Sequence, residues 1–152
     1  MPAEEPFFDT SYLVRLYLED VGFEAVRERA AAGPSVAAAW HAQAEIAATL
    51  HHAFRERRMA SDVFRAALDQ FACDREAGLF RWLPLTPDVQ RRLEKALRDA
   101  SASVFIRGAD ALHLACAAEH GFRAVYSNDR HFLAAAGVFG IKGIDIVSGS
   151  EW

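Results

Sequence analysis

The chain has 152 residues, of which 52% are hydrophobic and 25% charged, and its formal net charge is −4. This composition is ordinary for a globular protein with one buried core, and we predict a single domain over residues 1–152. The acidic balance argues against an extended basic surface for non-specific nucleic-acid binding, although arginines can still cluster locally. The acidic start and the lack of a long apolar run predict no signal peptide and no membrane span, so we expect a cytoplasmic protein.

Short apolar runs alternate with longer amphipathic stretches, which predicts strands separated by helices. The first run, at residues 6–8, is expected to be a strand, and a helix follows it with Thr10 or Ser11 as its N-cap. The next expected elements are a helix over 23–32, a small-residue strand over 35–40 and a helix with one buried stripe over 41–58.

The second half of the chain continues this alternation. Ser61 is expected to cap a helix, a strand is expected over 79–85, and Thr86 and Pro87 open a further helix. The remaining predicted elements are a helix over 108–119, a strand over 124–126, a helix over 130–136 and a strand over 144–147. Strands separated by helices pair in parallel through right-handed crossovers. The sequence therefore predicts a three-layer α/β/α sandwich with a central parallel sheet of four to five strands.

Four acidic residues stand at the predicted junctions between a strand and the next helix. Asp9 and Asp129 follow strands, whereas Glu45 and Asp110 lie in the first turns of helices. Ligands of open α/β sheets gather beyond the carboxyl ends of the strands, so we expect these side chains to lie together. Oxygen ligands favour Mg²⁺ or Mn²⁺ over zinc, and a cation would offset the repulsion between the carboxylates. Taken singly, Asp110 and Asp129 also fit helix caps, and Glu45 fits a partly exposed surface group.

The acids lie in four stretches with a fixed order and spacing, at residues 7–17, 44–46, 107–115 and 127–132. The third stretch is the most specific, because it contains the run Asp-Ala-Leu-His-Leu-Ala from Asp110 onward. Together the four stretches resemble the motifs of the PIN domain family, and within it the VapC-like toxins of bacterial type II toxin–antitoxin systems. The resemblance covers nearly the whole chain. Ser127 stands where the family usually has Thr and keeps the hydroxyl group.

This resemblance implies a metal-dependent endoribonuclease that hydrolyses RNA phosphodiester bonds with Mg²⁺ or Mn²⁺. It also implies a homodimer that is inhibited by a cognate antitoxin protein, with no membrane partner. The catalytic residues and metal ligands by position are Asp9, Glu45, Asp110 and Asp129. Thr10 and Ser127 are expected to orient these carboxylates. The residues that could contact phosphate or antitoxin carboxylates, or simply lie solvated at the surface, are Arg15, Arg107 and Arg130.

Two other functions fit parts of the pattern. An aspartate-based phosphatase places an Asp after its first strand, but it needs a second Asp two residues after Asp9, where this chain has Ser11. A catalytically inactive PIN module that acts as a partner- or RNA-binding domain is the main alternative, although such modules usually lose one or more of the acids. The choice of RNA over DNA rests on the resemblance alone.

The remaining histidines, aromatic residues and cysteines are given structural roles. His41, His51 and His52 do not have the spacing of a zinc site, and His113 is expected to be structural although it shares a helix face with Asp110. The residues expected in the core are Trp40, Trp82, the eleven phenylalanines, Cys73 and Cys116.

Overall fold

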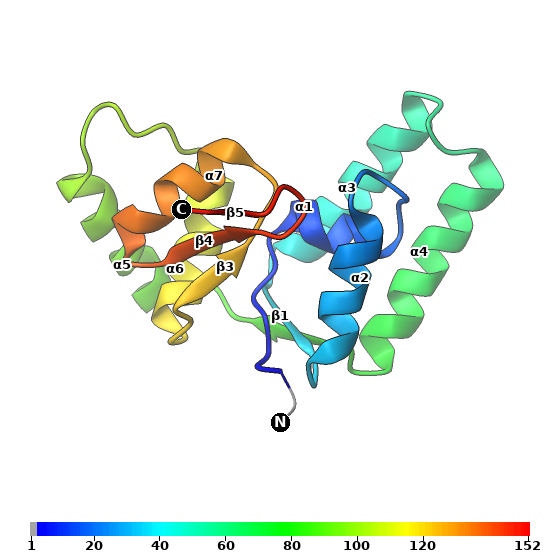
Figure 1. Ribbon diagram of the computed structural model, residues 1–152, viewed down its shortest axis with the longest axis horizontal. Coiled ribbons are helices and arrows are strands. Elements are labelled where there is room, and N and C mark those ends of the chain that lie inside the picture. Colours follow the sequence, from blue (N-terminus) through cyan, green and yellow to red (C-terminus); the bar gives the residue numbers. More distant parts are fainter. Residues whose placement is uncertain (1–2) are drawn as a thin grey trace.

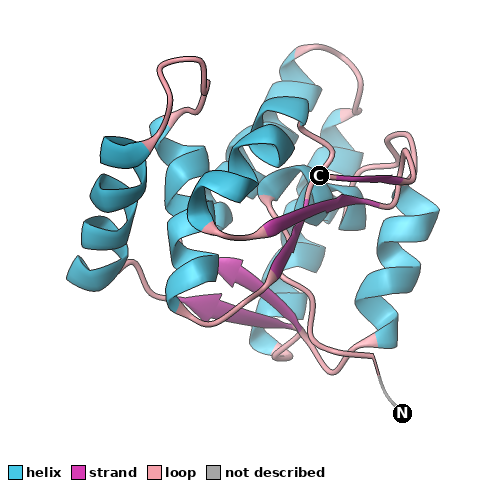
Figure 2. Cartoon of the chain, turned by 60° about the vertical axis from the view of Figure 1, so that its left-hand side comes forward, coloured by secondary structure: helices cyan, strands magenta, loops and turns pink. Residues whose placement is uncertain are grey.

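The computed structural model describes residues 3–152 and shows helices on both sides of a layer of strands (Figures 1 and 2). The α-helices are α1 (Thr10–Leu13), α2 (Phe23–Ala32), α3 (Ala42–Arg55), α4 (Ser61–Glu76), α5 (Pro87–Asp99), α6 (Gly108–Glu119) and α7 (Arg130–Ala135). Two short 3₁₀ helices are η1 (Val14–Leu16) and η2 (Ala136–Phe139). The strands are β1 (Val36–Ala39), β2 (Phe80–Leu83), β3 (Ala124–Tyr126), β4 (Lys142–Asp145) and β5 (Ser150–Glu151). None of the helices formed by residues 3–152 is long and apolar enough to cross a membrane.

A two-residue seam joins the strands into one layer. β1 pairs in parallel with β2, β3 pairs in parallel with β4, and β5 runs antiparallel to β4. Phe7 and Phe8 lie between the two groups and form isolated parallel bridges to Ala37 and Tyr126. The amide of Phe8 donates to the carbonyl of Ala37 at 3.0 Å, and the amide of Tyr126 donates to the carbonyl of Phe7 at 2.9 Å. The spatial order is therefore β2, β1, the seam, β3, β4 and β5.

The two seam residues point to opposite faces of this layer, as successive residues of an extended chain do. Phe7 is fully buried in a core that includes residues of α5, α6 and α7, and Phe8 is fully buried in a second core with residues of α1 to α4. In Figure 1 these two groups of helices lie to the left and to the right of the strands. The mixed α/β class with parallel strand pairing is confirmed, and each face of the strands has its own hydrophobic core.

Several local predictions are wrong. The last long strand covers Lys142–Asp145 instead of 144–147, and the chain then reverses through Gly149 (φ 76°) into the antiparallel strand β5. A short hairpin can join antiparallel strands only, so this edge could not be parallel. The N-cap of α1 is Asp9 rather than Thr10 or Ser11, because its side chain accepts the amide of Tyr12. The N-cap of α4 is Ala60, and Ser61 is the first residue of that helix.

Three residues that the sequence placed in the core are exposed in the structure. Trp40 is 59% exposed and Phe105 is 55% exposed, because one follows the end of β1 and the other lies in the loop before α6, both beyond the packed layers. Cys73 is also exposed, on α4. Trp82 packs partly buried against the second core, and Cys116 is buried as predicted.

Candidate functional site

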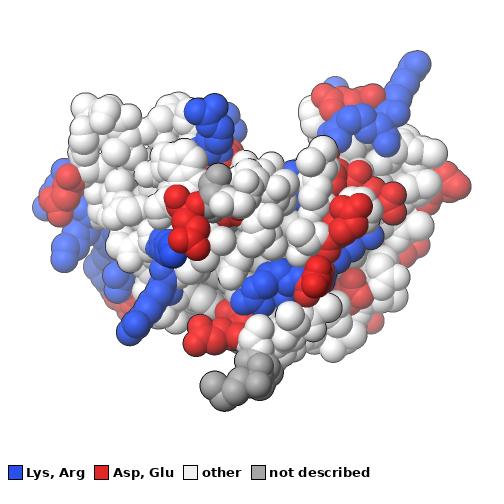
Figure 3. All heavy atoms as spheres, viewed as in Figure 1, with Lys and Arg blue, Asp and Glu red and all other residues white. Residues whose placement is uncertain are grey.

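The predicted acids lie where strands end and helices begin. Asp9 follows the seam, Glu45 is in the first turn of α3, Asp110 is in the first turn of α6, and Asp129 is the N-cap of α7. The space-filling view shows a broad notch between two raised parts of the molecule (Figure 3). In the ribbon these parts are the loop that leads from α5 into α6 and the turn between α3 and α4.

Asp9 is buried in a set of hydroxyl donors. Its side chain is 5% exposed, and its Oδ1 accepts from the Ser11 hydroxyl at 2.6 Å and from the Tyr12 amide at 3.2 Å. Its Oδ2 accepts from the Ser127 hydroxyl at 2.5 Å. Burial raises the pKa of Asp9 to about 6, because the hydrogen bonds to its ionised form only partly replace the lost hydration.

Ser127 couples Asp9 to Asp129. Ser127 is fully buried, and the same hydroxyl oxygen that donates to Asp9 accepts from the amide of Asp129 at 2.9 Å. The carboxylate of Asp129 in turn accepts from the amides of His131 at 2.8 Å and Phe132 at 3.2 Å at the start of α7. Two of the four predicted acids are therefore held next to each other through one hydroxyl group.

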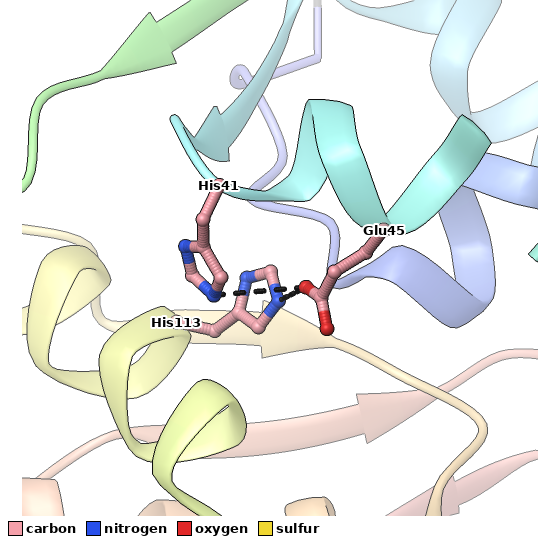
Figure 4. Close-up of side chains that lie close together, drawn as sticks. All are labelled: His41, Glu45 and His113. Carbon is pink, nitrogen blue, oxygen red and sulfur yellow. Dashed lines mark hydrogen bonds and ion pairs between the residues drawn. The ribbon is translucent and has the colours of Figure 1, made fainter. Parts of the chain in front are cut away.

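Glu45 is surrounded by the Thr10 hydroxyl group and by two imidazoles, and Figure 4 shows the imidazoles of His41 and His113 beside its carboxylate. Its Oε1 accepts from the Thr10 hydroxyl at 2.9 Å and from Nε2 of His113 at 2.6 Å, and Nε2 of His41 lies 3.6 Å away. The side chain of Glu45 is 32% exposed. Burial acts to raise the pKa of Glu45, but the hydrogen bond from His113 and the neighbouring groups outweigh burial and lower it. Burial together with the nearby His113 lowers the pKa of His41.

Asp110 responds to the charges of the other acids. Burial raises its pKa, and the negative charges of Asp129 and Glu45 raise it further, against the opposing effects of His113 and Arg107. Carboxylates influence each other in this way only over short separations, because solvent and salt screen longer ones. Asp110, Asp129 and Glu45 thus belong to one electrostatic cluster.

The acids are close, but they do not converge on one point. Among residues 3–152, no three of the four acids place ligand atoms within 4.8 Å of one another. The group that does so consists of His41, Glu45 and His113. Repulsion between ionised carboxylates opposes a tighter arrangement of the acids when no cation lies between them.

The three predicted arginines have different surroundings. Arg15 is 6% exposed, donates to two backbone carbonyl groups and donates to Oδ1 of Asn128 at 3.0 Å. It therefore braces the segment after Asp9 against the loop after β3, and little of its guanidinium faces solvent. Arg107 and Arg130 are exposed at the starts of α6 and α7, next to the acids of those helices.

Two residues of this region, His41 and Asp145, were not predicted from the sequence as part of the site. His41 and Glu45 have the i, i+4 spacing that places side chains on one face of a helix, which was a usable signal. Asp145 carried no local signal. It is 3% exposed and accepts from the Tyr12 hydroxyl at 2.8 Å and from Asn128 at 2.9 Å. These bonds outweigh burial and lower the pKa of Asp145. The bond from Tyr12 to Asp145 also ties α1 to β4.

A profile of the PIN domain matches residues 7–138. The chain belongs to the PIN domain family. The fold of this PIN domain, residues 3–152, is also similar to the crystal structure of Mycobacterium tuberculosis VapC20, which is described as a sarcin-ricin loop cleaving toxin. The TM-score is 0.64 at 23% sequence identity, over 88% of this chain and 95% of that chain. A search of curated protein sequences finds no match. The family predicted from the four sequence stretches is thereby confirmed.

Proposed function

We propose that this PIN domain is a metal-dependent endoribonuclease that hydrolyses RNA phosphodiester bonds and is the toxin of a toxin–antitoxin pair. The observation that carries the proposal is the electrostatic cluster at the strand ends, where burial and the charges of Asp129 and Glu45 raise the pKa of Asp110. A PIN fold that gathers carboxylates at this edge has the groups that phosphodiester hydrolysis requires. Clusters of carboxylates with perturbed pKa values are also a general mark of functional sites.

The donor set fits a hard divalent cation. Asp9, Glu45, Asp110 and Asp129 offer oxygen ligands, which suit Mg²⁺ or Mn²⁺. Burial raises the pKa values of Asp9 and Asp110, so the folded chain alone does not fully stabilise their charged forms. When bound, such a cation supplies a Lewis acid that activates water and stabilises charge on the phosphoryl oxygens.

The chain's own groups orient the carboxylates and the substrate. The Ser127 hydroxyl fixes Asp9 and the backbone of Asp129, and the Thr10 hydroxyl fixes Glu45. Outer hydrogen bonds of this kind set the direction of a carboxylate and hence the geometry of attack. Arg107 and Arg130, exposed beside the acids, are proposed to bind RNA phosphates.

The partners are proposed by analogy with the structural relative. VapC20 is described as a toxin, and on this basis we assign RNA as the substrate, a cognate antitoxin as the inhibitor and a homodimer as the assembly. We further propose that residues 1–152 form one domain. These assignments concern the biological setting and stand apart from the chemistry of the site.

The test is cleavage of a mixed, labelled RNA pool by the purified protein with Mn²⁺, with Mg²⁺ or with EDTA. Asp9→Asn and Asp110→Asn should abolish cleavage, whereas Asp69→Asn, which removes an exposed acid of α4, should retain it. A DNA pool of the same sequences should stay intact. Cleavage that requires metal and both acids establishes the enzyme.

A different result would favour the inactive-module alternative. If the wild-type protein cleaves nothing and its melting temperature is unmoved by millimolar Mn²⁺, the site holds no catalytic cation. If Asp110→Asn cleaves as fast as the wild type, the four-acid assignment is wrong even if the protein is a ribonuclease.

A further inference from the structure

The most compact group of metal-ligand atoms in the described part of the chain contains two imidazoles. His41, Glu45 and His113 each offer one ligand atom, and these atoms lie within 4.8 Å of one another. Oε1 of Glu45 lies 3.6 Å from Nε2 of His41 and 2.6 Å from Nε2 of His113. Figure 4 shows both rings directed toward this carboxylate from two separate elements.

The fold holds the two imidazoles together. The rings of His41 and His113 have their centroids 4.1 Å apart, and His113 is only 1% exposed. His41 is the N-cap of α3, and its Nε2 donates to the carbonyl of Ala109 at 2.9 Å in the metal-free protein. A cation on Nε2 would replace this bond, with the ring proton on Nδ1. The group is therefore set by tertiary structure and does not depend on a flexible loop.

This set of ligands is different from the four-acid set. Two His and one Glu form a known ligand set for zinc that leaves a fourth position open, whereas Mg²⁺ prefers oxygen ligands alone. Zinc–ligand bonds of about 2.0–2.1 Å place the ligand atoms of a tetrahedral site about 3.3 Å apart. The His41–Glu45 separation of 3.6 Å is already close to this value. The His113–Glu45 separation of 2.6 Å needs to open by less than an ångström, which is a small side-chain movement.

A second observation concerns the other nitrogen of each ring. Nδ1 of His41 and Nδ1 of His113 are buried and have no hydrogen-bond partner among residues 3–152. Buried polar atoms are nearly always paired, so hydrogen bonding within the protein accounts for Nε2 of each ring but leaves each Nδ1 without a partner. The lack of a hydrogen-bond partner at Nδ1 also limits the affinity for a metal, because such a partner typically strengthens metal binding by an imidazole about 10- to 100-fold. We therefore expect a site of micromolar rather than nanomolar affinity.

We propose that His41, Glu45 and His113 form an exchangeable site for a zinc-like divalent cation, and that occupation of this site inhibits the nuclease by engaging Glu45. Binding of the cation follows from the three ligands alone. The inhibition rests on the proposed function, because Glu45 is also assigned to the Mg²⁺ or Mn²⁺ site. Mg²⁺ and zinc thus compete for one carboxylate, and the protein is active only where free zinc is low.

The binding test uses Zn²⁺ and Co²⁺ with the metal-free wild-type protein. Calorimetry should show one Zn²⁺ per chain with micromolar affinity in the presence of millimolar Mg²⁺. Co²⁺ should produce the strong visible absorption of a tetrahedral nitrogen and oxygen site, which a carboxylate-only site does not give. His41→Gln and His113→Gln should each weaken Zn²⁺ binding by about 100-fold or more, beyond the scale of losing an outer partner.

The controls separate binding from folding and from catalysis. His52→Gln removes an exposed histidine of α3 and should bind Zn²⁺ as the wild type does. Because His113 is buried, His113→Gln can fail to fold, and His41→Gln, whose side chain is 18% exposed, then decides the question. Asp110→Asn should lose cleavage but keep the zinc affinity. Zn²⁺ should inhibit RNA cleavage by the wild type, and His41→Gln should need a much higher Zn²⁺ concentration for the same fractional inhibition.

The two proposals fail in different ways. Zinc binding that is absent, or unchanged in His41→Gln, overturns the site whether or not the protein cuts RNA. Zinc binding without any ribonuclease activity keeps the site and overturns the proposed function. Binding with no inhibition of an active enzyme shows that Glu45 is not shared, which overturns the regulatory part.

Discussion

The four predicted acids form an acidic cluster with one half around Asp9 and the other around Glu45, and the pKa shifts of these two carboxylates have opposite directions. In the half around Asp9, three donors surround a side chain that is 5% exposed, and yet burial raises its pKa to about 6. In the half around Glu45, one hydroxyl and an imidazole surround a side chain that is 32% exposed, and its pKa is lowered. Asp9 has more donors than Glu45, and yet its pKa is the one that is raised, so the number of donors does not decide the direction of the shift.

The difference shows what stabilises a carboxylate inside a protein. The hydroxyl and amide donors only partly replace the water that the buried Asp9 loses, whereas Glu45 keeps part of its hydration and accepts a direct hydrogen bond from His113, which lowers its pKa. The Glu45 half is therefore ionised at neutral pH without help. With a pKa of about 6, Asp9 keeps a protonated fraction near neutral pH, and a nearby cation removes it, so we expect metal binding and ionisation of Asp9 to be coupled.

The largest expected effect is on catalysis. Asp9→Asn and Glu45→Gln should each lower the single-turnover rate by about 10³-fold or more, the scale of losing a group that stabilises charge in the transition state. The measurement is cleavage of one defined RNA at saturating Mn²⁺. If Glu45→Gln keeps the wild-type rate, only the buried half of the cluster is catalytic.

The next effect is on stability and separates the two halves directly. The pKa of Asp9 is about 6 in the folded protein against 3.8 for a free side chain, so folding disfavours its charged form. The free energy of unfolding is therefore highest, as far as Asp9 is concerned, below about pH 4, where Asp9 is protonated. It falls by an amount on the order of 2–3 kcal/mol as the pH rises through about 6. Asp9→Asn should be more stable than the wild type at about pH 7, as measured by urea unfolding in EDTA.

A pH series provides the control for that comparison. The stability of Asp9→Asn should be flatter than that of the wild type between about pH 4 and 7, and added Mn²⁺ should stabilise the wild type more than the variant. Two parallel pH profiles would show that burial of Asp9 does not control its ionisation. The comparison between the two halves would then break down.

A smaller effect is expected at Ser127, which links two acids through one hydroxyl. Ser127→Ala should lower metal affinity or activity by about 10- to 100-fold, because Asp9 loses a donor and the Asp129 amide loses its acceptor. Ser127→Thr keeps the hydroxyl and should stay close to the wild type. Mn²⁺ titration of both variants tests this, and an equal loss in both would point to packing of the fully buried site instead.

The smallest effect is expected at Thr10. Thr10→Val removes one donor to Glu45, but His113 still donates to the same oxygen, so activity should fall only a few-fold. The free energy of unfolding should fall by about 1 kcal/mol, the usual value of one hydrogen bond. Thr10→Ser is the matched control and should restore both. A loss as large as that of Ser127→Ala would show that the two halves depend equally on their hydroxyl groups.

Much of this arrangement could be predicted from the sequence, because local patterns specify it. Apolar periodicity predicted the helices, and the position of each acid after a strand or at a helix start predicted that they share one edge. The surroundings of His113 could not be predicted, since its hydrogen-bond partner Glu45 lies 68 residues away. Exposure of Trp40 and Phe105 depends on where the layers end, which aromatic character does not reveal. The strand Ser150–Glu151 is too short to show any periodicity.

The seam at Phe7 and Phe8 also sets the order in which the protein can assemble during synthesis. Phe7 can pair with Ala37 as soon as β1 has been made, but Tyr126, the bridge partner of Phe8, is made much later. Parallel pairing cannot begin before both strands exist. The bond from Ser127 to Asp9 therefore forms only after the chain has been made as far as β3. A nascent chain in which residues 127–129 have not yet been made therefore lacks both this bond and Asp129, and its set of acids is incomplete.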